Sequence, residues 1–243
     1  MKRLSTVAVA TALSAGLLGL APEATAAPPT CPDAAHPIVS VSDDFDLTVG
    51  TKKVQKTDLD VLVDDRCGVD KVVAVVTSPR RTYRVTLTEG SDDPTSHTTG
   101  FSGTLRVDPD DLRNSDAGLW AVSYRVNDDS TKVATGSGRV RRATRVSFNA
   151  GPEPVRNNTI TFSGKLERAD WNKSRYRGIR GDVRVVVEVC CEEDDVVARF
   201  TTRSNGKYRV TQTFPGPDDY SLVYAGSDTT AGTKSRVDRV DAP

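Results

Sequence analysis

Apolar and polar residues alternate along most of the chain after residue 37, and turn residues separate the alternating segments. In the segment 81–89, Tyr83, Val85 and Leu87 fall on one face of an extended strand, and charged or hydroxyl residues fall on the other. No segment repeats apolar residues at i, i+3, i+4 and i+7, which is the pattern of an amphipathic helix. The sequence therefore predicts an all-β protein, with at most one helical turn around Pro109–Arg113.

The predicted strands are short, and turn-rich sequences such as SPRR, EGSDDPTS and NDDS lie between them. In the first half they are Ile38–Val41, Phe45–Val49, Leu59–Val63, Lys71–Thr77, Thr82–Thr88, Gly103–Val107, Leu119–Val126 and Lys132–Val140. In the second half they are Thr144–Asn149, Thr159–Leu166, Asp182–Cys190, Val196–Thr202, Lys207–Phe214, Tyr220–Tyr224 and Lys234–Val240. The proline-containing sequence NAGPEPVRNN is expected to be a turn-rich crossing at a sheet edge.

A faint internal repeat divides the chain. GTLRV followed by GLWAVSYR in the first half parallels GKYRV followed by DYSLVYAG in the second. The sequence DAGLW, which ends at Trp120, has the form of the aromatic corner that opens strand F of an immunoglobulin sandwich. We therefore predict two immunoglobulin-like antiparallel β-sandwiches, residues 27–142 and 143–243.

The N-terminus has the organisation of a secretory signal peptide. Lys2 and Arg3 precede an apolar run from Val7 to Leu20, and small residues follow at the expected cleavage position. The apolar run is too short to span a bilayer. We expect residues 1–26 to be removed, and the mature protein to be secreted and extracellular without a membrane anchor.

Net charge argues against a nucleic-acid partner. Loss of Lys2, Arg3 and Glu23 with the leader takes 33 basic and 33 acidic residues to 31 and 32. Nucleic-acid-binding domains are usually strongly basic, and this chain is close to neutral.

Four cysteines are present, which is consistent with an oxidising compartment. Four cysteines allow three pairings, and we favour a disulfide between Cys31 and Cys67, which would tie the mature N-terminus to the first sandwich. Cys190 and Cys191 are adjacent, so their side chains point to opposite faces of an extended strand. They are predicted to be two thiols, a link to another chain, or a vicinal disulfide at a distorted strand end. Without a nearby histidine or further cysteine, a metal site at this pair is not expected.

The segment 166–184, LERADWNKSRYRGIRGDVR, is the best candidate for contact with a ligand. It concentrates arginine, lysine and aromatic residues, which suit anionic groups. The candidate ligand-binding residues are Trp171, Lys173, Arg175, Tyr176, Arg177 and Arg180. Two interpretations remain open: a platform for an anionic cell-wall polymer, surface glycan or protein, or a loop whose aromatic residues fold back as a plug.

Other functions have weaker support. Acidic clusters such as Asp64-Asp65 and Asp92-Asp93 leave a calcium-stabilised scaffold as an alternative, but none has the spacing of an EF-hand. The two histidines, His36 and His97, lie in no recognisable catalytic motif, and no Gly-x-Ser-x-Gly elbow or phosphate-binding loop is present. We therefore predict a non-catalytic protein without a cofactor or metal, and keep a secreted hydrolase as the second alternative.

Residues 143–242 also resemble a module of secreted actinobacterial proteins. The resemblance is carried by PEPV, GKLERADW, YRGIRG, SNGKYRV and YAGSDTT. It implies an exported immunoglobulin-like sandwich without an established activity, in a family whose members sometimes carry a calcium-binding label. The sequence VEVCCEEDDVV departs from the family pattern, in which a hairpin rich in lysine, glycine and serine is expected.

Overall fold

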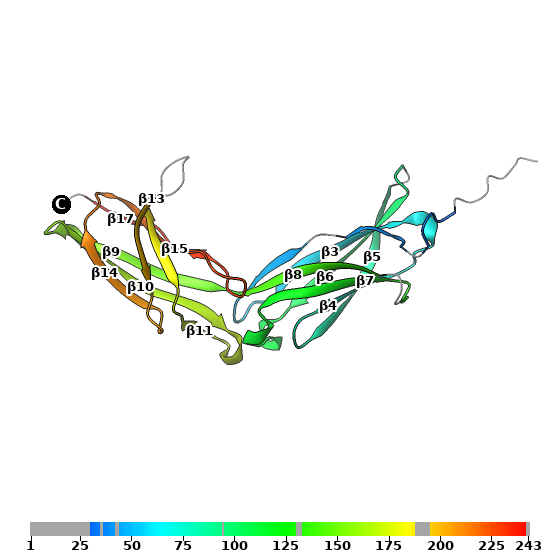
Figure 1. Ribbon diagram of the computed structural model, residues 1–243, viewed down its shortest axis with the longest axis horizontal. Coiled ribbons are helices and arrows are strands. Elements are labelled where there is room, and N and C mark those ends of the chain that lie inside the picture. The colour runs from blue at the N-terminus through cyan, green and yellow to red at the C-terminus, as the bar shows by residue number, and fades with distance from the viewer. Residues whose placement is uncertain are drawn as a thin grey trace, which may run out of the picture. The chain divides into compact units, whose positions relative to one another are not determined.

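The chain folds almost entirely into β-strands in the computed structural model, as Figure 1 shows. Within the described residues, helical structure is limited to 3-10 turns of three residues each. The predicted all-β class is therefore confirmed. The structure describes residues 30–34, 36–41, 44–93, 95–129, 133–187 and 195–241.

The first eight strands form one sheet, in the hydrogen-bonded order β1-β3-β6-β5-β4-β7-β8-β2. Their bounds are Ile38–Val41 (β1), Phe45–Val49 (β2), Gln55–Asp64 (β3), Val72–Thr77 (β4), Thr82–Asp93 (β5), Thr98–Val107 (β6), Gly118–Val126 (β7) and Val133–Arg142 (β8). All neighbours are antiparallel except β2 and β8, which run parallel. The antiparallel arrangement predicted from the sequence is confirmed for all the other neighbouring strands of this sheet.

Strand β5 connects two layers of this sheet, because its two halves pair with different strands. Residues 82–87 pair with β4, whereas residues 88–93 pair with β6 across a register shift. As a result, β1, β3, β6 and the end of β5 form one layer, and the start of β5, β4, β7, β8 and β2 form the other. Immunoglobulin sandwiches divide their strands in this way. The predicted turn EGSDDPTS was partly wrong, because residues 89–93 continue the strand by pairing with β6.

The remaining strands form two further sheets. One contains β9, β10, β11 and β14, and the other contains β12, β13, β15, β16 and β17. Their bounds are Thr144–Arg156 (β9), Thr159–Asp170 (β10), Arg175–Gly178 (β11), Asp182–Val187 (β12), Asp195–Thr201 (β13), Lys207–Thr213 (β14), Asp218–Tyr224 (β15), Thr233–Lys234 (β16) and Asp238–Val240 (β17).

Strand β9 is longer than predicted. The sequence NAGPEPVRNN was expected to be a turn-rich crossing, but β9 continues to Arg156. Its pairing with β10 jumps from Gly151 opposite Thr161 to Arg156 opposite Thr159. Both prolines, Pro152 and Pro154, lie in the bulged part between these pairs, where no ladder pairing requires their missing N–H.

Two hydrophobic cores lie within these sheets. The first contains Trp120 and Tyr124 of β7 among valines and leucines of β2 to β8. The second contains Phe162 of β10 and Tyr220 of β15. Residues from Cys31 onward belong to one compact unit, and the division at residue 142 stays a prediction.

Each core has an aromatic residue anchored to the backbone four positions earlier. Trp120 Nε1 donates to the Asp116 carbonyl oxygen at 2.7 Å, and the Tyr220 hydroxyl donates to the Gly216 carbonyl oxygen. Both rings lie near the start of the strand that occupies the F position, where immunoglobulin sandwiches carry a tyrosine corner. The repeat noted in the sequence therefore corresponds to two equivalent corners.

The disulfide between Cys31 and Cys67 is present, as predicted. It joins the segment before β1 to the 3-10 turn Asp65–Cys67. Cys190, Cys191 and the predicted signal peptide 1–26 lie outside the described residues.

Candidate functional site

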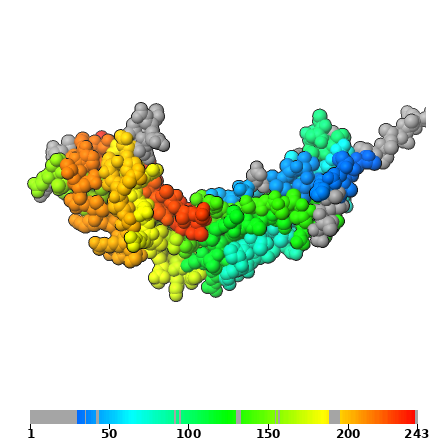
Figure 2. All heavy atoms as spheres, in the orientation of Figure 1, coloured from blue at the N-terminus to red at the C-terminus, as the bar shows by residue number. Residues whose placement is uncertain are grey.

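The candidate segment is a hairpin formed by β10, a 3-10 turn at Trp171–Lys173 and β11. The two strands pair from Glu167 opposite Gly178 to Asp170 opposite Arg175. Strand β11 was not predicted from the sequence, because RYRG has no alternation of apolar residues. We refer to residues 167–178 as the basic hairpin; its atoms reach the surface in yellow-green in Figure 2.

Trp171 is buried, with 3% of its surface exposed. Its ring belongs to the first core, although the preceding strand, β10, contributes mainly to the second. The indole Nε1 donates to the Gly50 carbonyl oxygen at 2.8 Å, at the end of β2. Trp171 is therefore a plug, which is one of the two roles that the sequence left open for it.

Trp171 reaches the first core because the alternation of core-facing residues changes phase towards the end of β10. Ile160, Phe162 and Leu166 occupy even-numbered positions and point into the second core. Beyond them, the odd-numbered Ala169 and Trp171 point into the first core. The single segment thus contributes side chains to both cores.

Asn114 fixes the turn of the hairpin by three hydrogen bonds. Its side-chain oxygen accepts from the Trp171 backbone N–H at 3.0 Å, and its Nδ2 donates to Asp170 Oδ1 at 2.8 Å. Its own backbone N–H donates to the side-chain oxygen of Asn172 at 3.1 Å. These bonds satisfy polar groups around the buried indole and hold the backbone in place.

The charged candidates lie on the outside of the hairpin, except Arg180, which follows it by two residues. Lys173, Arg175, Arg177 and Arg180 are exposed, and Tyr176 is half-buried. The guanidinium of Arg145 lies over the Tyr176 ring, 4.4 Å from its centroid. The structure thus separates the predicted set into one buried residue and five residues that solvent reaches.

An open groove of about 440 Å³ runs along this hairpin. Lys165, Arg175 and Arg177 supply its positive charge, and Tyr176 supplies an aromatic face. Gly178, Ser204 and Asn205 complete its lining. A groove with this charge and shape suits an extended anionic chain.

Glu167 partly neutralises the groove. It accepts from Lys165 Nζ at 2.6 Å and from Arg145 Nε at 2.8 Å. Burial would raise the pKa of this carboxyl, but the hydrogen bonds from Lys165 and Arg145 outweigh burial and hold the pKa below its usual range. Glu167 therefore stays ionised at neutral pH and orients two basic side chains.

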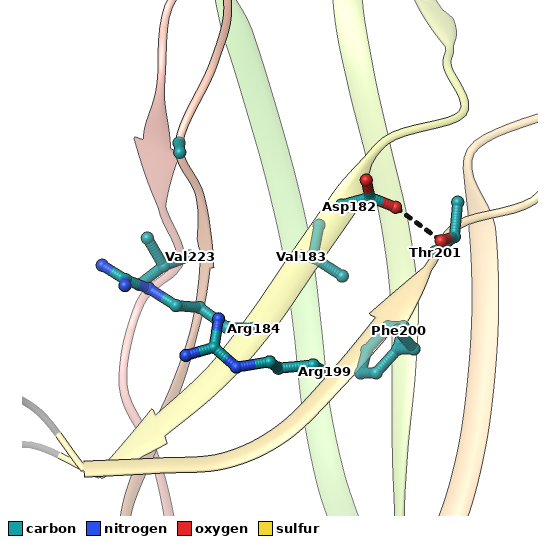
Figure 3. A pocket seen from close by; sticks show the side chains of 8 residues that line it. Asp182, Val183, Arg184, Arg199, Phe200, Thr201 and Val223 are labelled. Carbon is teal, nitrogen blue, oxygen red and sulfur yellow. Dashed lines mark hydrogen bonds between the residues drawn. The ribbon is translucent and has the colours of Figure 1, made fainter.

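A second basic surface lies on the outer face of β12 and β13. Arg184 and Arg199 are opposite each other in the register, and Figure 3 shows both guanidinium groups projecting to the same side. They line a depression of about 500 Å³, in which the Thr201 hydroxyl donates to Asp182 at 2.5 Å. Like charges directly opposite in a sheet repel each other, so this pair offers an alternative place for an anion.

Clustered acidic residues would favour a calcium scaffold, and a histidine beside a hydroxyl and a carboxylate would favour a hydrolase. Among the described residues, no three His, Cys, Asp or Glu side chains are grouped to hold a metal ion. Several turn acids instead bond to neighbouring residues: Asp64 to Arg66, Asp93 to Ser96 and Asp108 to the backbone of Asp110. His97 is exposed in the turn between β5 and β6, with Asp65 at 3.8 Å.

No protein-family model matches the chain, and no curated protein matches its sequence. Among solved structures, the D0-D1 domain of Intimin is 13% identical, covers 84% of this chain and 98% of its own length, and has a TM-score of 0.26. The major pilin subunit of Bacillus cereus is 10% identical, covers 81% of this chain and 62% of its own length, and has a TM-score of 0.27.

A pair of immunoglobulin domains, Dpr2 Ig1-Ig2 in complex with DIP-Theta, is 8% identical and has a TM-score of 0.30; the match covers 84% of this chain and 65% of that one. At such TM-scores these similarities carry no argument about the fold or the function of this chain. No helix among the described residues is long and apolar enough to cross a membrane.

Proposed function

We propose that this protein is a secreted, non-catalytic binding or structural module whose basic hairpin contacts an anionic cell-wall polymer or surface glycan. The observation that carries the proposal is that one short hairpin contains both a buried anchoring residue and exposed basic residues. Trp171 is fixed in the first core, while Arg175, Arg177 and Lys173 project to solvent from the same short segment.

Anchoring the hairpin lowers the entropic cost of binding. A flexible basic loop would have to be ordered when a ligand binds, which costs free energy for each immobilised segment. Here the indole hydrogen bond to Gly50 and the bonds from Asn114 already fix the backbone. The groove is thus presented as a preformed surface.

Export is part of the proposal. The leader-like sequence 1–26 and the Cys31–Cys67 disulfide both fit an oxidising, extracellular environment. The resemblance of residues 143–242 to exported actinobacterial proteins points the same way. In that setting, exposed arginines suit a surface polymer that is rich in phosphate or carboxylate groups.

The proposal is tested by binding to immobilised poly(glycerol phosphate), with neutral dextran as the blank. The double variant Arg175→Ala/Arg180→Ala should bind at least about tenfold more weakly, since each charge-assisted contact contributes about 1 kcal/mol or more. Binding by the unaltered protein should fall steeply as salt is added, because polyanion binding releases counterions.

Arg184→Ala/Arg199→Ala is the matched control, since it also removes two exposed arginines but from β12 and β13. It should bind nearly as well as the unaltered protein. The reverse ranking of the two double variants would move the site to the surface in Figure 3 and contradict the proposal. Equal retention on dextran and polymer would also contradict it.

A further inference from the structure

A smaller pocket lies behind the basic hairpin, and its electrostatics are unusual. Its volume is about 250 Å³. Three arginines, Arg142, Arg168 and Arg177, line it together with a single carboxylate, Asp170. Asn114, Ala169, Gly178 and Ile179 supply the remaining walls.

Arg142 is the most deeply placed of these arginines. Only 9% of its surface is exposed, and it ends β8. Its backbone is fixed on both sides, because its N–H donates to Thr229 and its carbonyl oxygen accepts from Ala231. Its guanidinium Nε is buried and has no hydrogen-bond partner among the described residues.

The surroundings of Arg142 disfavour its charge. Burial, followed by repulsion from Arg168, lowers the pKa of Arg142 to about 10. The group is therefore still protonated at neutral pH, in a place where its charge is poorly solvated. A buried charge without a partner is costly, and proteins normally pair it.

Asp170 attracts the Arg142 charge, but this attraction does not offset burial and the repulsion from Arg168, and the Arg142 Nε still lacks a hydrogen-bond acceptor among the described residues. Arg168 Nη1 donates to the Thr230 hydroxyl at 2.9 Å, which is a neutral acceptor. Asp170 is engaged elsewhere: its Oδ1 accepts from Asn114 and its Oδ2 lies 3.4 Å from Arg177 Nη1. Burial would raise the pKa of Asp170, but its bonds to Asn114 and Arg177 outweigh burial and keep the pKa low. One carboxylate thus faces three guanidinium groups.

We propose that this pocket binds a small oxyanion group, phosphate or a chemically similar sulfate or carboxylate, between Arg142 and Arg168. Guanidinium groups bind such anions through paired N–H donors, and Arg142 has a buried donor available. The volume corresponds to about eight water molecules, which is ample for one oxyanion and a short substituent.

The pocket deepens the proposed function, because Arg177 lines both the pocket and the groove. In this arrangement the groove holds an extended polymer and the pocket holds one of its charged groups. The inference rests on the proposed function for the identity of the polymer, but a free anion can bind in the pocket without it.

The direct test measures the melting temperature with millimolar inorganic phosphate, against chloride at equal ionic strength. At about ten times the dissociation constant, phosphate should raise the melting temperature by about 3–6 °C. Arg142→Met should lose this rise, and its melting temperature without phosphate should equal or exceed that of the unaltered protein, since an uncompensated buried charge is gone. The control Arg139→Met, on the exposed side of the same strand, should keep the full rise.

Two results would overturn the inference: no rise in the unaltered protein, or the same rise in Arg142→Met as in Arg139→Met. If Arg142→Met does not fold, Arg168→Met gives the same readout. Glycerol phosphate and glucuronate, used in place of inorganic phosphate, distinguish a phosphate-bearing source from a carboxylate-bearing one.

The variant Arg175→Ala/Arg180→Ala removes one groove arginine and one exposed arginine two residues after the hairpin, and neither residue lines the pocket. It therefore separates this inference from the proposed function. It should lose polymer binding and keep the phosphate-dependent rise. A phosphate-dependent rise in a protein that binds no polymer would refute the proposed function and leave the pocket standing. Polymer binding without any phosphate-dependent rise would refute the pocket alone.

Discussion

The first and second cores both consist mainly of apolar side chains from β-strands, but they are completed differently. The second core is closed by residues of its own strands, with Phe162 packed against Tyr220 at a centroid distance of 5.7 Å. The first core has a disulfide near its N-terminal end and receives Ala169 and Trp171 from a later part of the chain. The comparison shows that the basic hairpin is a structural element of the first core as well as a candidate binding surface.

The largest loss of stability is expected from substitution of Trp171. Trp171→Ala removes a large buried ring and its hydrogen bond to Gly50, and should lower the free energy of unfolding by about 4–5 kcal/mol. Urea unfolding followed by circular dichroism measures the change. Lys173→Ala, two residues away and exposed, should change stability by less than about 0.5 kcal/mol. Similar small effects for both variants would mean that the indole is no plug.

The next largest loss of stability is expected from removal of the disulfide. Cys31 and Cys67 are 36 residues apart, and closing a loop of this length should stabilise the protein by about 4 kcal/mol in the chain-entropy model. The double variant Cys31→Ser/Cys67→Ser should therefore unfold at a lower urea concentration. Hydrogen exchange should show faster opening in β1 and β3 than in β12 and β15. Equal acceleration in both cores would indicate that they unfold as one cooperative body.

How far the sequence predicts this architecture differs between elements. The alternation in β2 and β5 located these strands because burial follows the two-residue period of an extended chain. It could not reveal that β5 changes partners at residue 88, since pairing depends on contacts distant in sequence. The sequence DAGLW identified the corner at Trp120 for the same local reason, because its bond spans four residues. The corner at Tyr220 was not predicted, although its bond to Gly216 also spans four residues.

The candidate site was predicted only in part. Composition alone pointed to the basic hairpin, but it did not distinguish the buried Trp171 from the exposed Arg175. The pocket was missed altogether. Arg142 and Arg168 look like ordinary strand arginines, and only the packing of the strands brings them together. No sequence signal at Arg142 would have revealed its burial. The residues before it alternate between polar and apolar, as in many strands whose arginines are exposed.

A smaller effect tests the equivalence of the two corners. Tyr220→Phe deletes the hydroxyl that donates to Gly216 and should cost about 1 kcal/mol. Tyr176→Phe is the control on the half-buried hairpin tyrosine and should be nearly neutral. Thermal unfolding of both variants gives the comparison, and an unchanged melting temperature for Tyr220→Phe would mean that the second corner contributes nothing to stability.

The smallest effect depends on pH. The pKa of Glu167 is lowered in the folded protein, so its contribution is present above the pKa of the unfolded chain and is lost as the pH falls through the lower, folded value. Between pH 6 and pH 3, the unaltered protein should therefore lose more stability than Glu167→Gln, by about 1 kcal/mol or less. Urea midpoints at the two pH values measure this, and parallel losses would exclude a role for the Lys165 and Arg145 bonds.

The burial of the Trp171 indole can be measured directly, because the chain has only two tryptophans. In the variant Trp120→Phe, all tryptophan fluorescence comes from Trp171. The structure predicts emission shifted to the blue and an iodide quenching constant several-fold lower than that of the same variant unfolded in urea. A quenching constant equal to that of the unfolded chain would place the ring in solvent and contradict the anchored hairpin.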